Sequence, residues 1–201
     1  MKNEEIYDLL QKFGFSQSSL HKLQIYAQSL LIYNKKYNLI SKNTEEQLWE
    51  RHILDCAQIV NFLDKKKTLK IADFGSGAGL PGIIMALFSD KFHVKLYEKS
   101  SVKRQFLKNM NKNLGLKMLI FDNLLTKKID VDVIICRAFK KLPELIRISR
   151  EICKKPHKMI ILKGKNAQRD INKVSLPTNY RYKLENSITE IDSKIILINA
   201  K

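Results

Sequence analysis

The stretch 71-IADFGSGAGLPGII-84 concentrates four of the seven glycines of this 201-residue chain within eight residues. Apolar residues precede and follow the glycines, which predicts a strand, a tight loop and a helix. Clustered glycines let a backbone adopt positive φ angles and come close to a ligand. We therefore expect a ligand-binding loop at the carboxyl edge of a sheet, where a first strand turns into a helix.

The letters of this loop allow two ligands. Read from Gly77, GAGLPG satisfies the dinucleotide fingerprint G-x-G-x-x-G; read from Asp73, the loop is D-x-G-x-G-x-G, which holds S-adenosylmethionine. A carboxylate about 5 Å from a unit charge contributes roughly 3 kcal/mol at an effective dielectric constant near 20, attracting a sulfonium and repelling a pyrophosphate. Pro81 also removes one N–H that a phosphate needs. Both arguments favour S-adenosylmethionine, and a nicotinamide-dependent oxidoreductase remains the alternative.

The predicted cofactor site includes the acid at the head of the loop and its glycines: Asp73, Gly75, Gly77 and Gly79. Glu98 ends the second predicted strand about 20 residues further on, where a carboxylate can accept both ribose hydroxyls. An acid at a strand end is otherwise an ordinary solvated cap, so Glu98 supports the cofactor site only together with the loop.

The rest of the chain alternates in the manner of an α/β protein. Helical segments such as 100–114 and 142–153 separate strand-like runs, which predicts a mostly parallel sheet covered on both faces. Residues 180–189 and 194–200 have no helix between them and predict an antiparallel pair at one sheet edge. The predicted parallel strands are 69–75, 93–99, 117–123, 131–138 and 158–164.

Residues 1–63 predict a helical extension, and 69–201 the cofactor-binding core of one domain spanning 1–201. Leu23, Tyr26 and Leu30 recur at helical spacing. Thr44 and Gln47 form a capping-box pattern that predicts the start of a further helix. Its apolar stripe is Trp49, Ile53, Cys56, Val60 and Leu63.

The chain is strongly basic, with 37 Lys and Arg against 20 Asp and Glu, a formal net charge of +17. Such an excess attracts polyanions, and nucleic acid is the usual one. An AT-rich genome, which favours Lys, Asn and Ile, is the competing explanation. The charge disfavours a methyltransferase that acts on small molecules.

Three distant cysteines without a CxxC or a His partner spacing predict neither a disulfide framework nor a metal site. The N-terminus lacks the apolar segment of a signal peptide, and no run approaches the roughly 20 apolar residues of a membrane span. We expect a cytoplasmic monomer with no membrane association and no obligate protein partner.

The sequence motifs of this chain resemble those of the bacterial ribosomal RNA small-subunit methyltransferase G family, also called glucose-inhibited division protein B. The glycine loop alone would indicate only a class I methyltransferase, whereas the motifs before and after it make the resemblance specific. These motifs are 33-YNKKYNLIS-41, 51-RHILDC-56, 73-DFGSGAGLPG-82, 103-KRQFL-107, 136-CRAF-139 and 162-LKGK-165.

The resemblance implies a Rossmann-like fold with a seven-stranded sheet, and methylation of N7 of one guanine in small-subunit (16S) ribosomal RNA. The substrate would be this RNA or the assembling small subunit. Carried over by motif position, the cofactor contacts fall on Gly75, Leu80, Leu124, Leu125 and Arg137. Family members often have an acidic residue where this chain has Leu125, so a side-chain hydrogen bond to the adenine would be lost there.

Guanine N7 carries an in-plane lone pair, so methylation needs positioning rather than proton removal. Accordingly, the sequence lacks the Asp/Asn-Pro-Pro-Tyr motif of amine methylation and the Pro-Cys pair of carbon methylation. Cys136 is interpreted as a packing residue. The catalytic residues stay unassigned, with Arg137, His52 and Lys163 as candidates.

Arg51 and Asp55 lie one helical turn apart, which predicts an exposed ion pair. His52 beside them could instead help to close the site over the base. A non-catalytic RNA-binding or ribosome-assembly protein is the other hypothesis that the basic surface leaves open.

Overall fold

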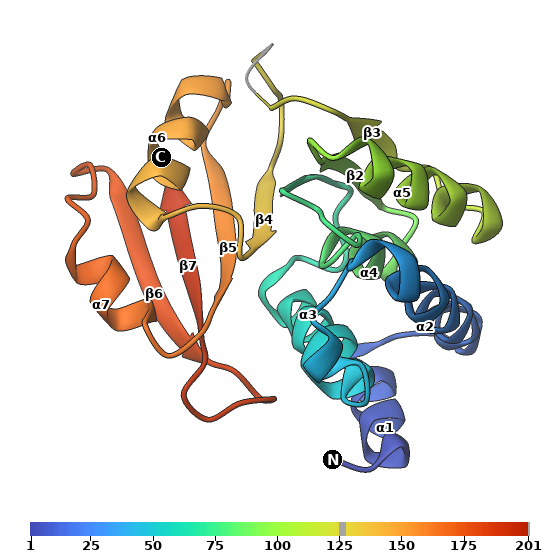
Figure 1. Ribbon diagram of the computed structural model, residues 1–201. Helices are drawn as coiled ribbons and strands as arrows, with labels where there is room; N and C mark the ends of the chain where they lie inside the picture. Colours follow the sequence, from blue (N-terminus) through green and yellow to red (C-terminus); the bar gives the residue numbers. More distant parts are fainter. Residues whose placement is uncertain (125–127, 201) are drawn as a thin grey trace.

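The computed structural model describes residues 1–124 and 128–200, which form a central sheet with helices on both faces (Figure 1). The sheet has the strand order β3-β2-β1-β4-β5-β7-β6. Its strands are β1 (Leu69–Phe74), β2 (Phe92–Tyr97), β3 (Leu119–Phe121), β4 (Val133–Arg137), β5 (His157–Lys163), β6 (Tyr180–Asn186) and β7 (Lys194–Ala200).

The first five strands are parallel, and β7 runs antiparallel to both β5 and β6. The predicted Rossmann-like α/β fold, with seven strands and an antiparallel edge hairpin, is confirmed. Several strands are shorter than predicted, and β3 covers only three residues of the expected run 117–123.

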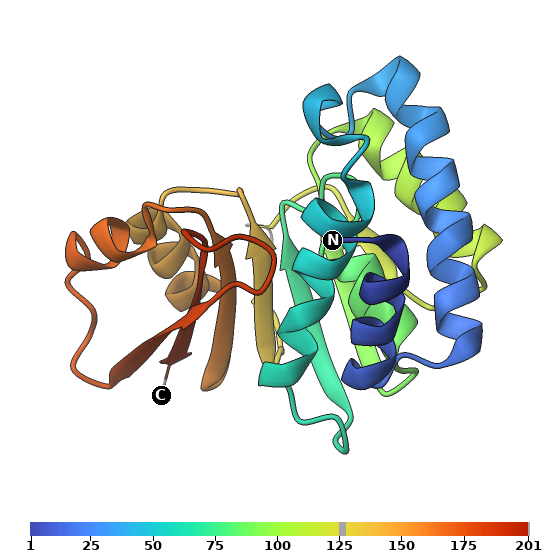
Figure 2. The same cartoon turned by 90° about the horizontal axis from the view of Figure 1, so that it is seen from below.

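The N-terminal helices α1 (Asn3–Phe13) and α2 (Gln17–Tyr37) pack on the same face of the sheet as α4 (Gly82–Phe88) and α5 (Ser101–Asn113). Helices α6 (Leu142–Ile152) and α7 (Ala167–Asn172) cover the opposite face. Figure 2 shows the two groups on opposite sides of the strands. Alternate residues of β4 explain the division, because Ile135 joins the first core and Ile134 the second.

The segment between α2 and β1 differs from the single capped helix that the sequence predicts. It consists of a 3₁₀ turn η1 (Lys42–Thr44), a π-helix η2 (Trp49–Leu54), a short α3 (Asp55–Ala57) and a second 3₁₀ helix η3 (Gln58–Phe62). The predicted stripe still faces the core, with Ile53, Cys56, Val60 and Leu63 buried and Trp49 half-buried.

The capping-box prediction at Thr44 is wrong. Its hydroxyl donates to Ser41 O (2.8 Å) and pairs with His52 Nε2 (2.7 Å) instead of capping a helix. The Thr44 hydroxyl therefore contacts Ser41 and His52 and not the helix end that the local pattern predicts.

Candidate functional site

The glycine loop joins β1 to α4 at the carboxyl edge of the sheet, where the sequence places it. The amides of Gly75 and Ser76 donate to Tyr97 O at 2.9 and 3.0 Å, which fastens the start of the loop to the end of β2. Tyr26 of α2 donates to Ala78 O at 2.9 Å. The N-terminal extension therefore helps to hold the loop.

Three of the four loop glycines make room for the protein itself. A Cβ at Gly75 would overlap the ring of Phe139, and one at Gly79 would overlap Ile83. At Gly82 a Cβ would lie 2.7 Å from Asp73 Oδ2. These glycines are needed for packing.

Gly77 is different. Its φ is +57°, and the nearest atom to an added Cβ would be Gly75 O at 3.9 Å, so the position faces open space. A positive φ with an unfilled outer side is the geometry of a backbone that a ligand approaches. Gly77 is thus the loop glycine that best fits a ligand.

Asp73 lies beneath the loop and is fully buried. Its Oδ2 accepts the Gly82 N–H at 3.0 Å, while Oδ1 has no partner among the described residues. Burial raises the pKa of Asp73 to about 7. A buried carboxylate with an unpaired oxygen suits a cationic ligand above the loop and would oppose a pyrophosphate.

Glu98 follows β2 and spans two backbone amides. Its Oε2 accepts Gly77 N–H and its Oε1 accepts Ser100 N–H, both at 2.8 Å. The carboxylate thus fixes the open glycine. Its contact with ribose hydroxyls stays a prediction, as do the cofactor contacts of the other loop residues.

Two of the three leucines predicted from the resemblance lie at different places along the carboxyl edge of the sheet. Leu80 is buried in the first core, and half-buried Leu124 packs against the second core near Tyr97 and Phe121. Leu125 lies outside the described residues.

A cavity of about 360 Å³ opens at the carboxyl ends of β4 and β5. Strand β4 is the neighbour of β1, which leads into the glycine loop. Arg137 of β4, Lys163 of β5 and His52 of η2 all line it, so the structure brings the three catalytic candidates together. Ala138 follows Arg137 with a φ of +51°, which turns the chain toward Phe139 and Gly75. Further lining residues are Thr44, Arg51, Asp55, Leu162, Gly164, Ser187, Thr189, Glu190, Ser193 and Lys194.

The predicted Arg51–Asp55 ion pair is wrong. Arg51 pairs with Glu190 at 3.0 Å, and Asp55 lies 4.0 Å from Arg137. The π-helical winding around these residues changes which side chains stack along one face.

Asp55 instead connects the N-terminal extension to the turn between β6 and β7. Its Oδ1 accepts from Gln58 Nε2 (2.9 Å) and Thr189 Oγ1 (3.0 Å), and Ile188 N–H donates to Gln58 Oε1 (3.0 Å). Burial raises the pKa of Asp55, and the Arg137 guanidinium acts in the opposite direction. The β6–β7 turn therefore forms one wall of the cavity.

His52 is buried and neutral in this setting. Burial and the nearby Arg137 and Arg51 charges lower its pKa to about 4. Its Nδ1 has no partner within the described part of the chain. A side chain with such a pKa does not change protonation near neutral pH.

Lys163 forms an ion pair with Asp170 of α7 at 2.8 Å, which holds its ammonium group at the cavity rim. Cys136 is 1% exposed, and burial raises its thiol pKa. The packing interpretation of Cys136 agrees with this position, because reactive cysteines are partly exposed and have a low pKa.

The model of the family described as rRNA small subunit methyltransferase G matches residues 19–196. The chain belongs to this family.

Two relatives agree with this membership. The chain is 32% identical over 197 residues to Ribosomal RNA small subunit methyltransferase G of Orientia tsutsugamushi (strain Ikeda), covering 97% of this chain and 98% of the relative. For the Pelagibacter ubique protein of the same name, identity is 32% over 203 residues, covering 97% and 94%. The resemblance drawn from the motifs is therefore confirmed, together with the assignment as an S-adenosylmethionine-dependent methyltransferase.

Two solved structures show the same fold at low sequence identity. The 16S rRNA methylase RmtB superimposes with a TM-score of 0.57 at 15% identity, covering 90% of this chain and 75% of that chain. A methyltransferase from Geobacter sulfurreducens gives 0.58 at 10% identity, covering 88% of each.

Sequence reasoning missed the cavity wall that the β6–β7 turn supplies. Thr189 and Glu190 contact Asp55 and Arg51, which are more than 130 residues away in the chain. The polar run 186-NSITEIDS-193 between two strands was the only signal, and it resembles an ordinary turn. No helix within the described ranges is long and apolar enough to cross a bilayer.

Proposed function

We propose that this member of the rRNA small subunit methyltransferase G family methylates N7 of a guanine in small-subunit ribosomal RNA. The observation that carries the proposal is the position of the Gly77 loop beside the Arg137 cavity. Strands β1 and β4 are hydrogen-bonded neighbours, with Asp73 opposite Ile135. This pairing supports a site in which the loops that follow the two strands hold a cofactor and a base side by side.

The loop residues fit S-adenosylmethionine. Gly77 offers open space for the ligand, and Glu98 fixes the backbone amide of Gly77. The buried Asp73 provides a compensating negative charge in its ionised form. When bound, this cofactor supplies an electrophilic methyl group on a cationic sulfur. The protein's part is to hold that methyl group in line with the nucleophile.

The cavity residues suit a guanine that reacts without losing a proton. Arg137 can grip a base edge or a phosphate with its planar guanidinium group. His52 would act as a neutral wall because its pKa of about 4 keeps it uncharged. No residue has to serve as a general base, since the N7 lone pair is already available.

Methylation at N7 places a positive charge on the base, and this charge needs a nearby anion. Asp55 is better placed for this than Glu98, because Asp55 lines the cavity, whereas Glu98 is engaged by two backbone amides. In its ionised form Asp55 would compensate both Arg137 and the methylated ring.

The substrate is the ribosomal RNA or the assembling small subunit. The net charge of +17 attracts this polyanion. The enzyme acts as a cytoplasmic monomer.

The test compares small-subunit rRNA from cells with and without the gene. Chemical cleavage at N7-methylguanosine should reveal one position that is methylated only when the gene is present. Wild-type protein should restore the mark, and the Gly77→Ala variant should restore it less completely. Identical cleavage patterns in both strains would contradict the proposed function.

A further inference from the structure

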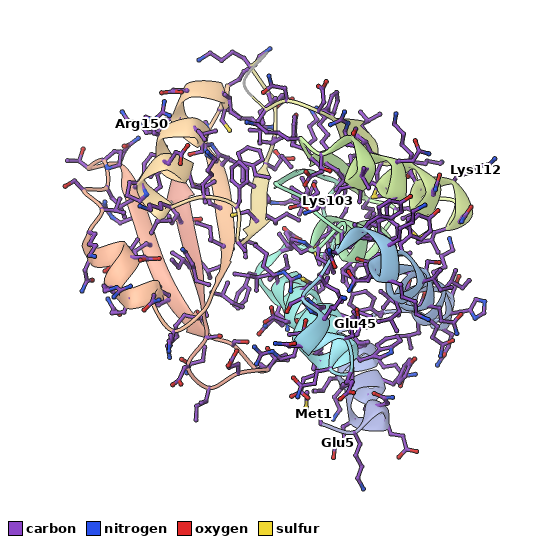
Figure 3. The ribbon with its side chains drawn as sticks, viewed as in Figure 1. Met1, Glu5, Glu45, Lys103, Lys112 and Arg150 are labelled. Carbon is purple, nitrogen blue, oxygen red and sulfur yellow. The ribbon has the colours of Figure 1, made fainter. Side chains whose placement is uncertain are left out.

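Helices α2 and α5 pack against each other and carry only one sign of charge. Together they contain seven Lys and Arg residues and no Asp or Glu. Figure 3 labels Lys103 and Lys112 near the two ends of α5. The basic residues are Lys22, Lys35, Lys36, Lys103, Arg104, Lys108 and Lys112.

Elsewhere in the protein many lysines are neutralised. Lys140 pairs with Glu144 at 2.7 Å, and Lys155 with Asp132 at 2.7 Å. None of the lysines of α2 and α5 forms an ion pair within the described residues. Glu45 reaches the end of α2, but it accepts a hydrogen bond from buried Asn34 (2.5 Å). Among the described residues, the positive charge of these two helices is therefore not compensated by ion pairs.

A groove of about 350 Å³ lies between the two helices, separate from the cavity at Arg137. Tyr37 and Val102 are 37% and 44% exposed in it. We name it the α2–α5 groove; its lining residues are Tyr33, Tyr37, Ser101, Val102, Gln105 and Asn109.

The groove offers stacking surfaces and hydrogen-bonding groups together. The rings of Tyr33 and Tyr37 have centroids 6.1 Å apart, and Lys36 Nζ lies 5.3 Å from the Tyr37 centroid. Asn109 Nδ2 donates to Tyr33 Oη at 2.8 Å, and Gln105 Nε2 donates to Asn109 Oδ1 at 3.1 Å. The side-chain oxygen of Gln105 has no partner among the described residues and is available to accept a hydrogen bond from a ligand.

We infer that the α2–α5 groove binds an unpaired nucleotide of the RNA substrate, with its base on Tyr37 and its phosphates on the surrounding lysines. Single-stranded RNA is bound by this combination of exposed aromatic rings, amide side chains and basic residues. An acidic peptide would satisfy the lysines but would leave the tyrosine faces unused. The inference rests on the proposed function for the identity of the RNA.

The groove begins close to the cofactor loop. Glu98 binds the Gly77 N–H with one oxygen and the N–H of Ser100, the N-cap of α5, with the other. Ser101, the next residue, already lines the groove. An RNA strand with its target guanine in the Arg137 cavity can therefore continue past the glycine loop along α5 and place another of its nucleotides in the groove.

The experiment compares Tyr37→Ala with Tyr37→Phe and with Tyr182→Ala, which removes a tyrosine that is 48% exposed on the edge strand β6. Fluorescence anisotropy with a labelled, unstructured RNA oligonucleotide gives Kd. Tyr37→Ala should weaken binding about 5- to 150-fold, as loss of one stacked base does. Tyr37→Phe and Tyr182→Ala should bind like wild type. Val102→Glu, which places a carboxylate in the groove, should also weaken RNA binding.

Affinity for S-adenosylmethionine should be unchanged in all four variants, which shows that they are folded. With small-subunit rRNA as substrate, Tyr37→Ala should raise KM for RNA and leave kcat close to wild type. The binding assay needs no methyl transfer, so it tests the groove even if the proposed reaction is wrong. Wild-type RNA affinity in Tyr37→Ala and Val102→Glu would overturn the inference. So would a Tyr37 dependence seen only with anionic phospholipid vesicles.

Discussion

Replacing Gly77 by alanine separates ligand contact from packing in the glycine loop. The added methyl group meets no protein atom closer than 3.9 Å, so the fold accommodates its volume. The φ of +57° is nevertheless unfavourable for alanine and should cost about 1–2 kcal/mol of unfolding free energy. If a ligand occupies the space above Gly77, the methyl group also crowds it, which typically costs about 1–3 kcal/mol.

Gly115 provides a matched control. Its φ is +62°, an added Cβ would meet nothing within 4 Å, and it follows α5 at the opposite end from Glu98. Gly115→Ala should therefore lose a similar unfolding free energy without affecting the cofactor. Gly82→Ala is the opposite control, because its Cβ would lie 2.7 Å from Asp73 Oδ2 and should damage the fold itself.

The assays are calorimetric titration with S-adenosylmethionine and urea unfolding. Gly77→Ala should raise Kd about 5- to 150-fold, and Gly115→Ala should leave it unchanged. Unchanged affinity in Gly77→Ala would refute the assignment of the open glycine to the cofactor. An equal loss of affinity in Gly115→Ala would show that strain, not contact, is responsible.

Three further predictions concern charge and protonation. The pKa of Asp73 is about 7 in the folded protein and 3.8 ordinarily, so between these values the folded state holds a proton that the unfolded chain has lost. The unfolding free energy of the ligand-free protein should thus fall as pH rises from about 4 to 7, by up to about 1.4 kcal/mol per pH unit. Urea titrations of Asp73→Asn should lack this pH-dependent loss of stability. The single-turnover rate of methyl transfer at saturating cofactor should be level from about pH 6 to 8.5, because the pKa of His52 is about 4. Methyl transfer should also persist in His52→Gln. A tenfold fall in the rate per pH unit that disappears in this variant would show that His52 is a general base. RNA affinity should fall linearly with salt on a log–log plot while cofactor affinity changes far less, and a flat RNA response would mean that the lysines reflect genome composition.

The parts of the fold that depend on local pattern could be predicted from the sequence. The clustered glycines located the strand–loop–helix unit, and the period of the apolar residues located the strands and the buried stripe around Ile53. Arg137 and Lys163 could be placed at one edge because parallel strands end on the same side of a sheet.

The contacts between distant segments could not be predicted in the same way. Arg51 has Asp55 four residues away, yet it pairs with Glu190, because the β6–β7 turn folds over the π-helix. Thr44 resembles a helix cap, yet it contacts His52. In each case a polar group takes a partner other than the one that its local pattern suggests, and for Arg51 only the assembled sheet brings that partner near.

The roles of the loop glycines show the same limit. The letters alone make Gly75, Gly77, Gly79 and Gly82 equivalent, and the structure divides them by what a Cβ would meet. For Gly75 that distinction depends on Phe139, which follows β4, for Gly79 on Ile83, and for Gly82 on Leu96 and Asp73.

The most direct measurement of the central claim is a reconstituted reaction. Purified protein is incubated with methyl-labelled S-adenosylmethionine and with small ribosomal subunits or their rRNA from cells lacking the gene, and the digested RNA is analysed for labelled nucleosides by mass spectrometry. We predict label in N7-methylguanosine at a single position, and much less label with Gly77→Ala at a concentration of S-adenosylmethionine near the wild-type Kd. Label on guanine N1 or on an exocyclic amine, or RNA that binds without acquiring label, would contradict the account.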